Sequence, residues 1–124
     1  MSILSFIIPL RSPETTKNWK QVSSDCVNTI LSILQQTDQD FDLYLVCNKE
    51  PEGLPKSTNI NVIADNFSLP TTLNEMRRDQ AIKIKKALVE IRSKGEAGNN
   101  FLMRVDADDF VSKHLVSFVK KNNQ

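Results

Sequence analysis

Apolar residues along this chain fall into two patterns, short continuous runs and longer segments with a three-and-four spacing. The continuous runs occupy residues 3–10, 41–47, 60–64 and 101–105. Runs of this kind predict strands that are buried on both faces, as in a parallel sheet. The three-and-four spacing places apolar side chains on one face of a helix. It predicts helices over residues 19–34, 73–94 and 111–121.

The predicted order is strand, helix, strand, strand, helix, strand, helix. This alternation indicates an α/β fold, with a mostly parallel sheet of about four strands and helices on both faces. The 124 residues suffice for one domain and are few for two, so we expect a single domain over residues 1–124. Ligands of such sheets bind at the carboxyl ends of the strands. That rule selects residues 9–12, 48–49 and 106–109.

The spacing also predicts which side of each later helix faces the core. In the second helix the inward stripe is Leu73, Met76, Gln80 or Ala81, Ile84, Leu88 and Ile91. Basic side chains are spread around the rest of that helix: Arg77, Arg78, Lys83, Lys85, Lys86 and Arg92. Gly95 and Gly98 mark its end. In the last helix we expect Leu115, Phe118 and Val119 to point inward.

Composition and charge exclude several classes of protein. The chain is 40% hydrophobic and 25% charged, as an ordinary globular protein is, and its net charge of +1 gives no overall attraction to nucleic acid. Cys26 and Cys47 lack the spacing of metal ligands and are expected to be buried thiols. We expect no signal peptide or membrane-spanning segment, and hence a cytoplasmic location by default. His114 has no suggested Ser or Cys partner and is assigned a structural role.

Three aspartates, at positions 106, 108 and 109, crowd the end of the last predicted strand. Their mutual repulsion opposes folding unless a cation or hydrogen-bond donors offset it, and a divalent ion such as Mg²⁺ or Mn²⁺ is the simplest offset. If the extended geometry continues, Asp106 and Asp108 share a face, with Ala107 leaving room between them. We expect Asp109 instead to cap the helix that begins near Val111.

Three segments of the chain carry a family resemblance. They are F-I-I-P at residues 6–9, S-I-L-Q-Q-T-D-Q-D-F-D-L-Y-L-V-C-N at 32–48 and R-V-D-A-D-D-F-V-S at 104–112. In this order they resemble the family 2 glycosyltransferases with the GT-A fold, over nearly the whole chain. The resemblance implies metal-dependent transfer of a sugar from a nucleotide-diphosphate sugar to an acceptor hydroxyl. It also implies an incomplete GT-A domain, in which residues 1–124 form the donor-binding half.

The resemblance assigns roles to individual residues. Asp108, with Asp106, would coordinate Mn²⁺ or Mg²⁺, and Asp106 would also contact the ribose or sugar of the donor, with a UDP-sugar as the first candidate. Arg78 would reach the base or a phosphate, or is a plain surface arginine. The nucleoside pocket would be lined by Pro9, Leu10, Arg11 and Asn48. The last of these replaces an aspartate that is common in the family, and so can form hydrogen bonds but carries no charge.

In the family, the acceptor site and the catalytic base come from the following half of the domain, so we expect the base beyond Gln124. This chain alone is then expected not to transfer sugar, and a sheet edge left uncovered would favour self-association. The alternative is a non-catalytic α/β module that binds a nucleotide or a protein, with the aspartates as a cap or metal-stabilised turn. The glycine patterns of P-loop and dinucleotide sites are absent, and a phosphatase nucleophile would require D-x-D after the first strand.

Overall fold

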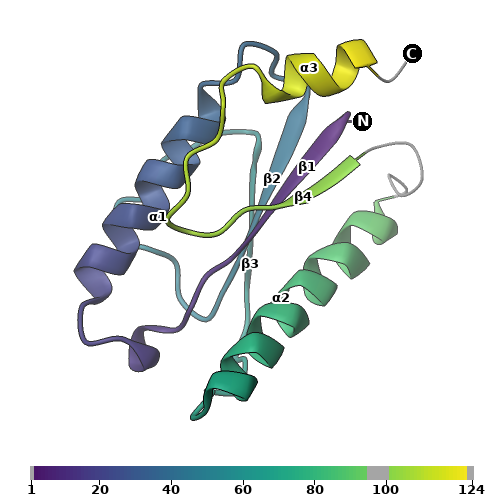
Figure 1. Cartoon of the computed structure of the whole chain (residues 1–124). Coiled ribbons are helices and arrows are strands. Elements are labelled where there is room, and N and C mark those ends of the chain that lie inside the picture. The colour runs from purple at the N-terminus through teal and green to yellow at the C-terminus, as the bar shows by residue number, and fades with distance from the viewer. Residues whose placement is uncertain (1, 95–100, 123–124) are drawn as a thin grey trace.

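Four parallel strands form the central sheet of the structure, a computed structural model that describes residues 2–94 and 101–122 (Figure 1). They are β1 (Leu4–Pro9), β2 (Phe41–Cys47), β3 (Ile60–Ala64) and β4 (Phe101–Arg104), in the spatial order β3-β2-β1-β4. The helices of this part of the chain are α1 (Trp19–Leu34), α2 (Leu73–Ser93), α3 (Leu115–Asn122) and the short 3-10 helix η1 (Pro13–Thr15). The predicted α/β class is therefore confirmed.

Strand β1 lies in the middle of the sheet, hydrogen-bonded to β2 on one side and to β4 on the other. All six of its residues are buried. Successive side chains of a strand point to opposite faces. Phe6 and Ile8 pack in the cluster that contains α1 and α3, whereas Ile7 packs with Ala87 and Ile91 of α2. The continuous apolar run of β1 thus reflects helices on both faces of the sheet (Figure 1).

Helix α1 covers one face of the sheet, with Cys26, Ile30 and Ile33 buried in the core cluster on that face. Asn18 caps its first turn by accepting a hydrogen bond from the backbone N–H of Gln21 at 3.1 Å. Both cysteines are free and buried, as predicted. Burial raises the pKa of the Cys26 thiol to about 12 and that of Cys47 to about 11, so both are protonated at neutral pH.

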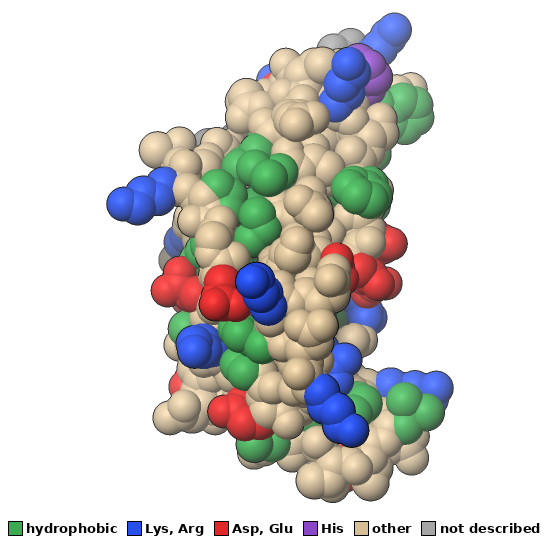
Figure 2. All heavy atoms as spheres, turned by 90° about the vertical axis from the view of Figure 1, so that its left-hand side faces the viewer, with side chains coloured by type: hydrophobic (Ala, Val, Ile, Leu, Met, Phe, Trp, Pro, Cys, Tyr) green, Lys and Arg blue, Asp and Glu red, His purple; other side chains and the backbone are tan. Residues whose placement is uncertain are grey.

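The side of the molecule on which α1 lies carries a mixed surface (Figure 2). Lysine and arginine side chains are interspersed there with aspartate and glutamate, and hydrophobic side chains are scattered among them. This pattern is typical of a solvated helix face. None of the helices in residues 2–94 and 101–122 is long and apolar enough to cross a bilayer.

Helix α2 covers the other face, and its predicted inward stripe is only partly correct. Thr72 caps it by accepting from the backbone N–H of Glu75, and hydrogen bonds from the Thr71 and Thr72 hydroxyls hold the pKa of the Glu75 carboxyl below its usual range. Ile91 is buried, with Ile84 and Leu88 packed beside it. Leu73 and Met76, which were predicted to point inward, are exposed, and Lys83 is fully buried. The predicted helix end at Gly95 and Gly98 lies outside the described residues.

Strands β3 and β4 form the two edges of the sheet, and the prediction of burial on both faces is wrong for both. Strand β4 is the more exposed, with all four of its residues exposed. It is shorter than predicted and ends at Arg104, although the N–H of Val105 still donates to Ile7 O at 2.9 Å. The exposed fractions of Phe101, Leu102 and Met103 are 46%, 48% and 38%. Within the described chain β4 pairs with β1 alone, which leaves its outer backbone groups unpaired. The uncovered sheet edge that the sequence predicts is therefore observed.

The last helix begins at Leu115, four residues later than predicted from Val111. Asp109 therefore does not cap it, and that prediction is wrong. Instead, the N–H of Asp109 donates to the carbonyl of Asp106 at 3.1 Å and closes a turn over residues 106–109. The buried residue of α3 is Val116, and Phe118 is 64% exposed rather than inward.

The late start of α3 follows from contacts between residues 111–116 and the end of α1. The buried Gln36 side chain donates to Ser112 O at 2.6 Å and accepts from the N–H of Val116 at 3.0 Å. The Ser32 hydroxyl accepts from the N–H of Val111 at 3.2 Å. These contacts hold the segment in a non-helical conformation. They also join the second and third segments of the family resemblance.

A substitution at Gln36 tests how much this junction stabilises the fold. Gln36→Leu leaves the N–H of Val116 and the carbonyl of Ser112 without their partner, which we expect to lower the free energy of unfolding by about 2 kcal/mol. Urea denaturation followed by circular dichroism measures the change. Gln35→Leu is the matched control, because Gln35 is exposed and caps α1 through its backbone alone. Equal losses in the two variants would contradict the assigned role of Gln36.

Candidate functional site

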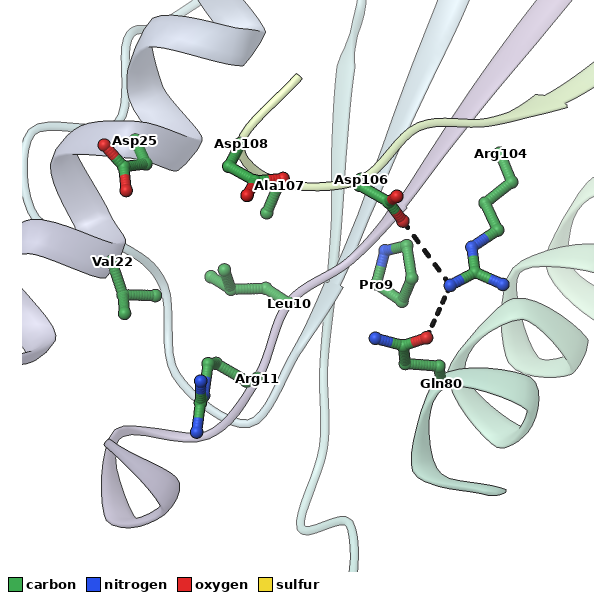
Figure 3. A pocket seen from close by; sticks show the side chains of 10 residues that line it. All are labelled: Pro9, Leu10, Arg11, Val22, Asp25, Gln80, Arg104, Asp106, Ala107 and Asp108. Carbon is green, nitrogen blue, oxygen red and sulfur yellow. Dashed lines mark hydrogen bonds and ion pairs between the residues drawn. The ribbon is translucent and has the colours of Figure 1, made fainter. Parts of the chain in front are cut away.

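A pocket of about 440 Å³ opens where the carboxyl ends of β1 and β4 meet, between α1 and α2 (Figure 3). Parallel neighbouring strands end at the same sheet edge, so the segments that follow them are brought together. The pocket is lined by Pro9, Leu10, Arg11, Val22, Asp25, Gln80, Arg104, Asp106, Ala107 and Asp108. The structure thus gathers the predicted residues 9–11 with both predicted metal ligands.

Two predicted site residues lie outside this pocket. Asn48 lines a hollow of about 240 Å³ beside Lys49 and Phe67, and Arg78 lines another, of about 440 Å³, between residues 66–70 and α2. The amide of Asn48 donates to Phe67 O at 2.9 Å, and no described residue donates a hydrogen bond to its buried side-chain oxygen. The predicted nucleoside pocket, with Asn48 beside residues 9–11, is therefore not one cavity here.

The aspartates do not continue the extended geometry of β4. Residues 106–109 form a turn, so continued extended geometry, the condition for Asp106 and Asp108 to share a strand face, is not met. In Figure 3, Asp108 lies on the side of the pocket near α1, where Asp25 is also found. Asp106 lies on the side near α2, facing Arg104. Both carboxylates still line the same pocket.

Arg104 and Gln80 were not among the predicted site residues. The Arg104 Nη2 donates to Gln80 Oε1 and to Asp106 Oδ1, the latter at 3.4 Å. The side chains of Arg104 and Asp106 are 47% and 57% exposed. For Arg104 the signal in the sequence was its opposite charge two residues before Asp106.

The second cation of the pocket, Arg11, is held against the neighbouring 3-10 helix. Its Nε donates to the Thr15 hydroxyl at 3.0 Å, and its Nη2 donates to the Thr15 carbonyl. Ser12 caps that helix, with its hydroxyl accepting from the N–H of Glu14 at 3.4 Å. These hydrogen bonds hold the Arg11 side chain in place, so that its positive charge lies at the pocket.

Lys83, which is fully buried, binds the backbone of Leu10 in the wall of the pocket. The Lys83 Nζ donates to Leu10 O at 2.7 Å and to Asp79 Oδ2 at 2.9 Å, and it lies 5.4 Å from the centre of the Phe67 ring. Lys83 thus connects α2 with the end of β1 and with the segment that binds Asn48. The prediction that Lys83 belongs to the solvated basic side of the helix is wrong. The signal that we missed was Asp79 four residues earlier, at the spacing of a helical ion pair.

The residues of the pocket are compatible with a hard divalent cation. Among the residues that the structure describes, no three or more His, Cys, Asp or Glu side chains form a group able to hold an ion. Asp106 and Asp108 therefore offer two carboxylates at most. Mg²⁺ is usually bound in this way, with one or two carboxylates and the remaining positions filled by water and substrate phosphates. The donor set fits Mg²⁺ or Mn²⁺ arriving with a phosphate ligand.

Removal of the buried ammonium group tests its support of the pocket. Lys83→Met leaves the Asp79 carboxylate and the Leu10 carbonyl without their partner, and we expect the free energy of unfolding to fall by about 3 kcal/mol. The exposed Lys85→Met on the same helix is the control and should change it by less than about 0.5 kcal/mol. Chemical denaturation of both variants gives the comparison. A loss at Lys83 no larger than that at Lys85 would refute the supporting role.

Comparison with known proteins adds no assignment to this geometry: no protein-family model matches the chain, and no curated protein matches it.

Proposed function

We propose that this chain is the donor-binding part of a metal-dependent glycosyltransferase of the family 2 type. It would bind a nucleotide-diphosphate sugar for transfer to an acceptor hydroxyl, and a UDP-sugar is the first donor to test. The observation that carries the proposal is the pocket itself, in which Asp106 and Asp108 meet residues 9–11 at the carboxyl end of a parallel sheet. This is where open α/β sheets bind their ligands.

In this proposal the residues of the pocket have different roles in donor binding. Asp108 and Asp106 would hold Mn²⁺ or Mg²⁺, which when bound supplies a Lewis acid for the negative charge on the departing diphosphate. Arg11 adds positive charge from the end of β1. Asn48 and Arg78, in the neighbouring hollows, would contact the nucleoside only if the ligand extends beyond the pocket along residues 66–70. The proposal assigns donor binding to these residues and assigns no general base to them.

Nucleotide titration tests the proposal. Isothermal titration of UDP should show binding that depends on Mn²⁺, and Asp108→Asn should weaken it at least tenfold because one of the two metal carboxylates is lost. Asp109→Asn is the matched control, since this neighbouring exposed carboxylate does not line the pocket. Equal affinities for UDP in the two variants, or binding that is independent of Mn²⁺, would exclude the proposed donor site.

A second candidate, a protein-binding module, is favoured by the uncovered edge of the sheet. Exposed residues of β4, Leu4 of β1 and three residues of α3 line a mainly apolar hollow of about 390 Å³ that includes Leu102, Met103, Leu115 and Val119. We propose a second copy of this chain as the occupant. Two β4 edges related by a two-fold axis can pair antiparallel, which satisfies the unpaired backbone groups of both. Centred on Leu102, this pairing places Leu102 opposite Leu102 of the other copy and Phe101 opposite its Met103, so apolar side chains meet on each face of the paired strands.

Sedimentation velocity over a range of concentrations tests self-association. The wild-type chain should form a dimer, and Leu102→Lys should shift it to monomer, because the lysine places like charges on both sides of the two-fold axis. Leu31→Lys, at a leucine of α1 that is 42% exposed, is the control and should leave the dimer intact. A wild-type chain that stays monomeric at the highest concentration, or equal effects of the two lysines, would contradict pairing through β4.

A further inference from the structure

We infer that Arg104, oriented by Gln80, binds a phosphate group of the ligand, and that it exchanges Asp106 for this phosphate when a metal diphosphate enters the pocket. The inference rests on the proposed donor site and adds a residue to it. Neither the aspartate motif nor the resemblance assigns Arg104 any role. Its position does so, because its side chain lines the pocket on the side opposite Asp25 and Asp108 (Figure 3).

The guanidinium group of Arg104 has donors to spare. Both of its contacts, to Gln80 and to Asp106, are made by Nη2, and no described residue accepts a hydrogen bond from Nε or Nη1. A planar guanidinium binds phosphate through two parallel N–H groups. The contact with Asp106 involves only one nitrogen of Arg104, so this bidentate mode is not used by Asp106. Arg104 is therefore held in place at one nitrogen while others remain available to a ligand.

The present partner of Arg104 is easily exchanged. Its 3.4 Å contact with Asp106 joins two side chains that are each about half exposed, and an ion pair of this kind contributes little to stability because water screens it. Gln80 is a neutral acceptor on α2, so its bond to Nη2 need not break when Asp106 turns away. The exchange thus keeps Arg104 oriented while both charged groups find stronger partners.

The same geometry explains why the anion must arrive with a metal. Asp25, Asp106 and Asp108 all line the pocket, so a free diphosphate meets carboxylates as well as the two arginines. Asp106 and Asp108 would together hold Mn²⁺ or Mg²⁺, and Arg104, no longer paired with Asp106, would then donate to the phosphate. Arg104 therefore contributes to diphosphate binding only in the presence of metal.

Two probes separate the parts of this inference: Mn²⁺ alone, followed by electron paramagnetic resonance, and inorganic pyrophosphate titrated with and without Mn²⁺. Arg104→Gln should weaken Mn²⁺-dependent pyrophosphate binding about tenfold, the loss expected for a charge-assisted contact. The same variant should bind Mn²⁺ alone equally well or more tightly, because Asp106 is released from its cation. Arg104→Lys should fall between wild type and Arg104→Gln.

Arg77→Gln is the matched control, an exposed arginine of α2 that lies outside the pocket, and it should match the wild-type chain in both titrations. Unchanged pyrophosphate affinity in Arg104→Gln would overturn the inference. Weaker binding of both Mn²⁺ and pyrophosphate, together with a lower melting temperature, would also overturn it, since that pattern indicates a structural role.

The test also separates this inference from the proposed function. If Asp108→Asn abolishes metal-dependent pyrophosphate binding and Arg104→Gln does not weaken it, the donor site stands and the role of Arg104 falls. If the wild-type chain shows no Mn²⁺-dependent binding of pyrophosphate, both are overturned.

Discussion

The contact between the Lys83 ammonium and the carbonyl of Leu10 is the interaction on which the candidate site depends. A buried charge is unfavourable unless it is paired, and Lys83 is paired with Asp79 while it also binds the backbone that follows β1. Since Leu10 N–H also donates to Val46 O at 2.9 Å, both backbone polar groups of this residue are satisfied. The wall of the pocket formed by residues 9–11 is therefore fixed before any ligand binds.

On the other face of the sheet, Gln36 fixes the backbone before and at the start of α3, as Lys83 fixes the backbone after β1. Its contacts also mark the limit of what sequence patterns predict. The predicted bounds of β2, β3 and α1 are correct, and those of α2 are correct to within one residue, because periodicity is a local property of each segment. The start of α3 was not predictable in this way. Residues 111–114 are compatible with a helix, but the Gln36 amide binds the backbone at Ser112 and Val116 and so competes with helix formation. The exposure of β4 was not predictable from its own sequence either, because it results from the position of β4 at the edge of the sheet, beside β1 alone.

About half of the candidate site was predictable from the sequence. Residues 9–11 and the pair Asp106 and Asp108 were expected at one sheet edge, because parallel strands end there together, and the structure brings them together. Arg104 was missed although its opposite charge two residues before Asp106 was visible. Gln80 was missed because no strand or helix pattern states which turn of α2 will face the end of β4. The fully buried position of Lys83 was missed for the same reason, although its spacing from Asp79 was visible.

The polar contacts of this region fall into two kinds that differ in how readily they change. Lys83 and Gln36 are buried, so breaking their bonds leaves polar groups without partners in a region that water does not reach, and they hold the backbone. Arg104 and Asp106 are about half exposed, and water replaces a lost partner at small cost in free energy. A site that must bind a charged ligand benefits from this division. The buried contacts keep the distance between residues 9–11 and the aspartate turn constant, while the exposed side chains between them are free to take a new partner.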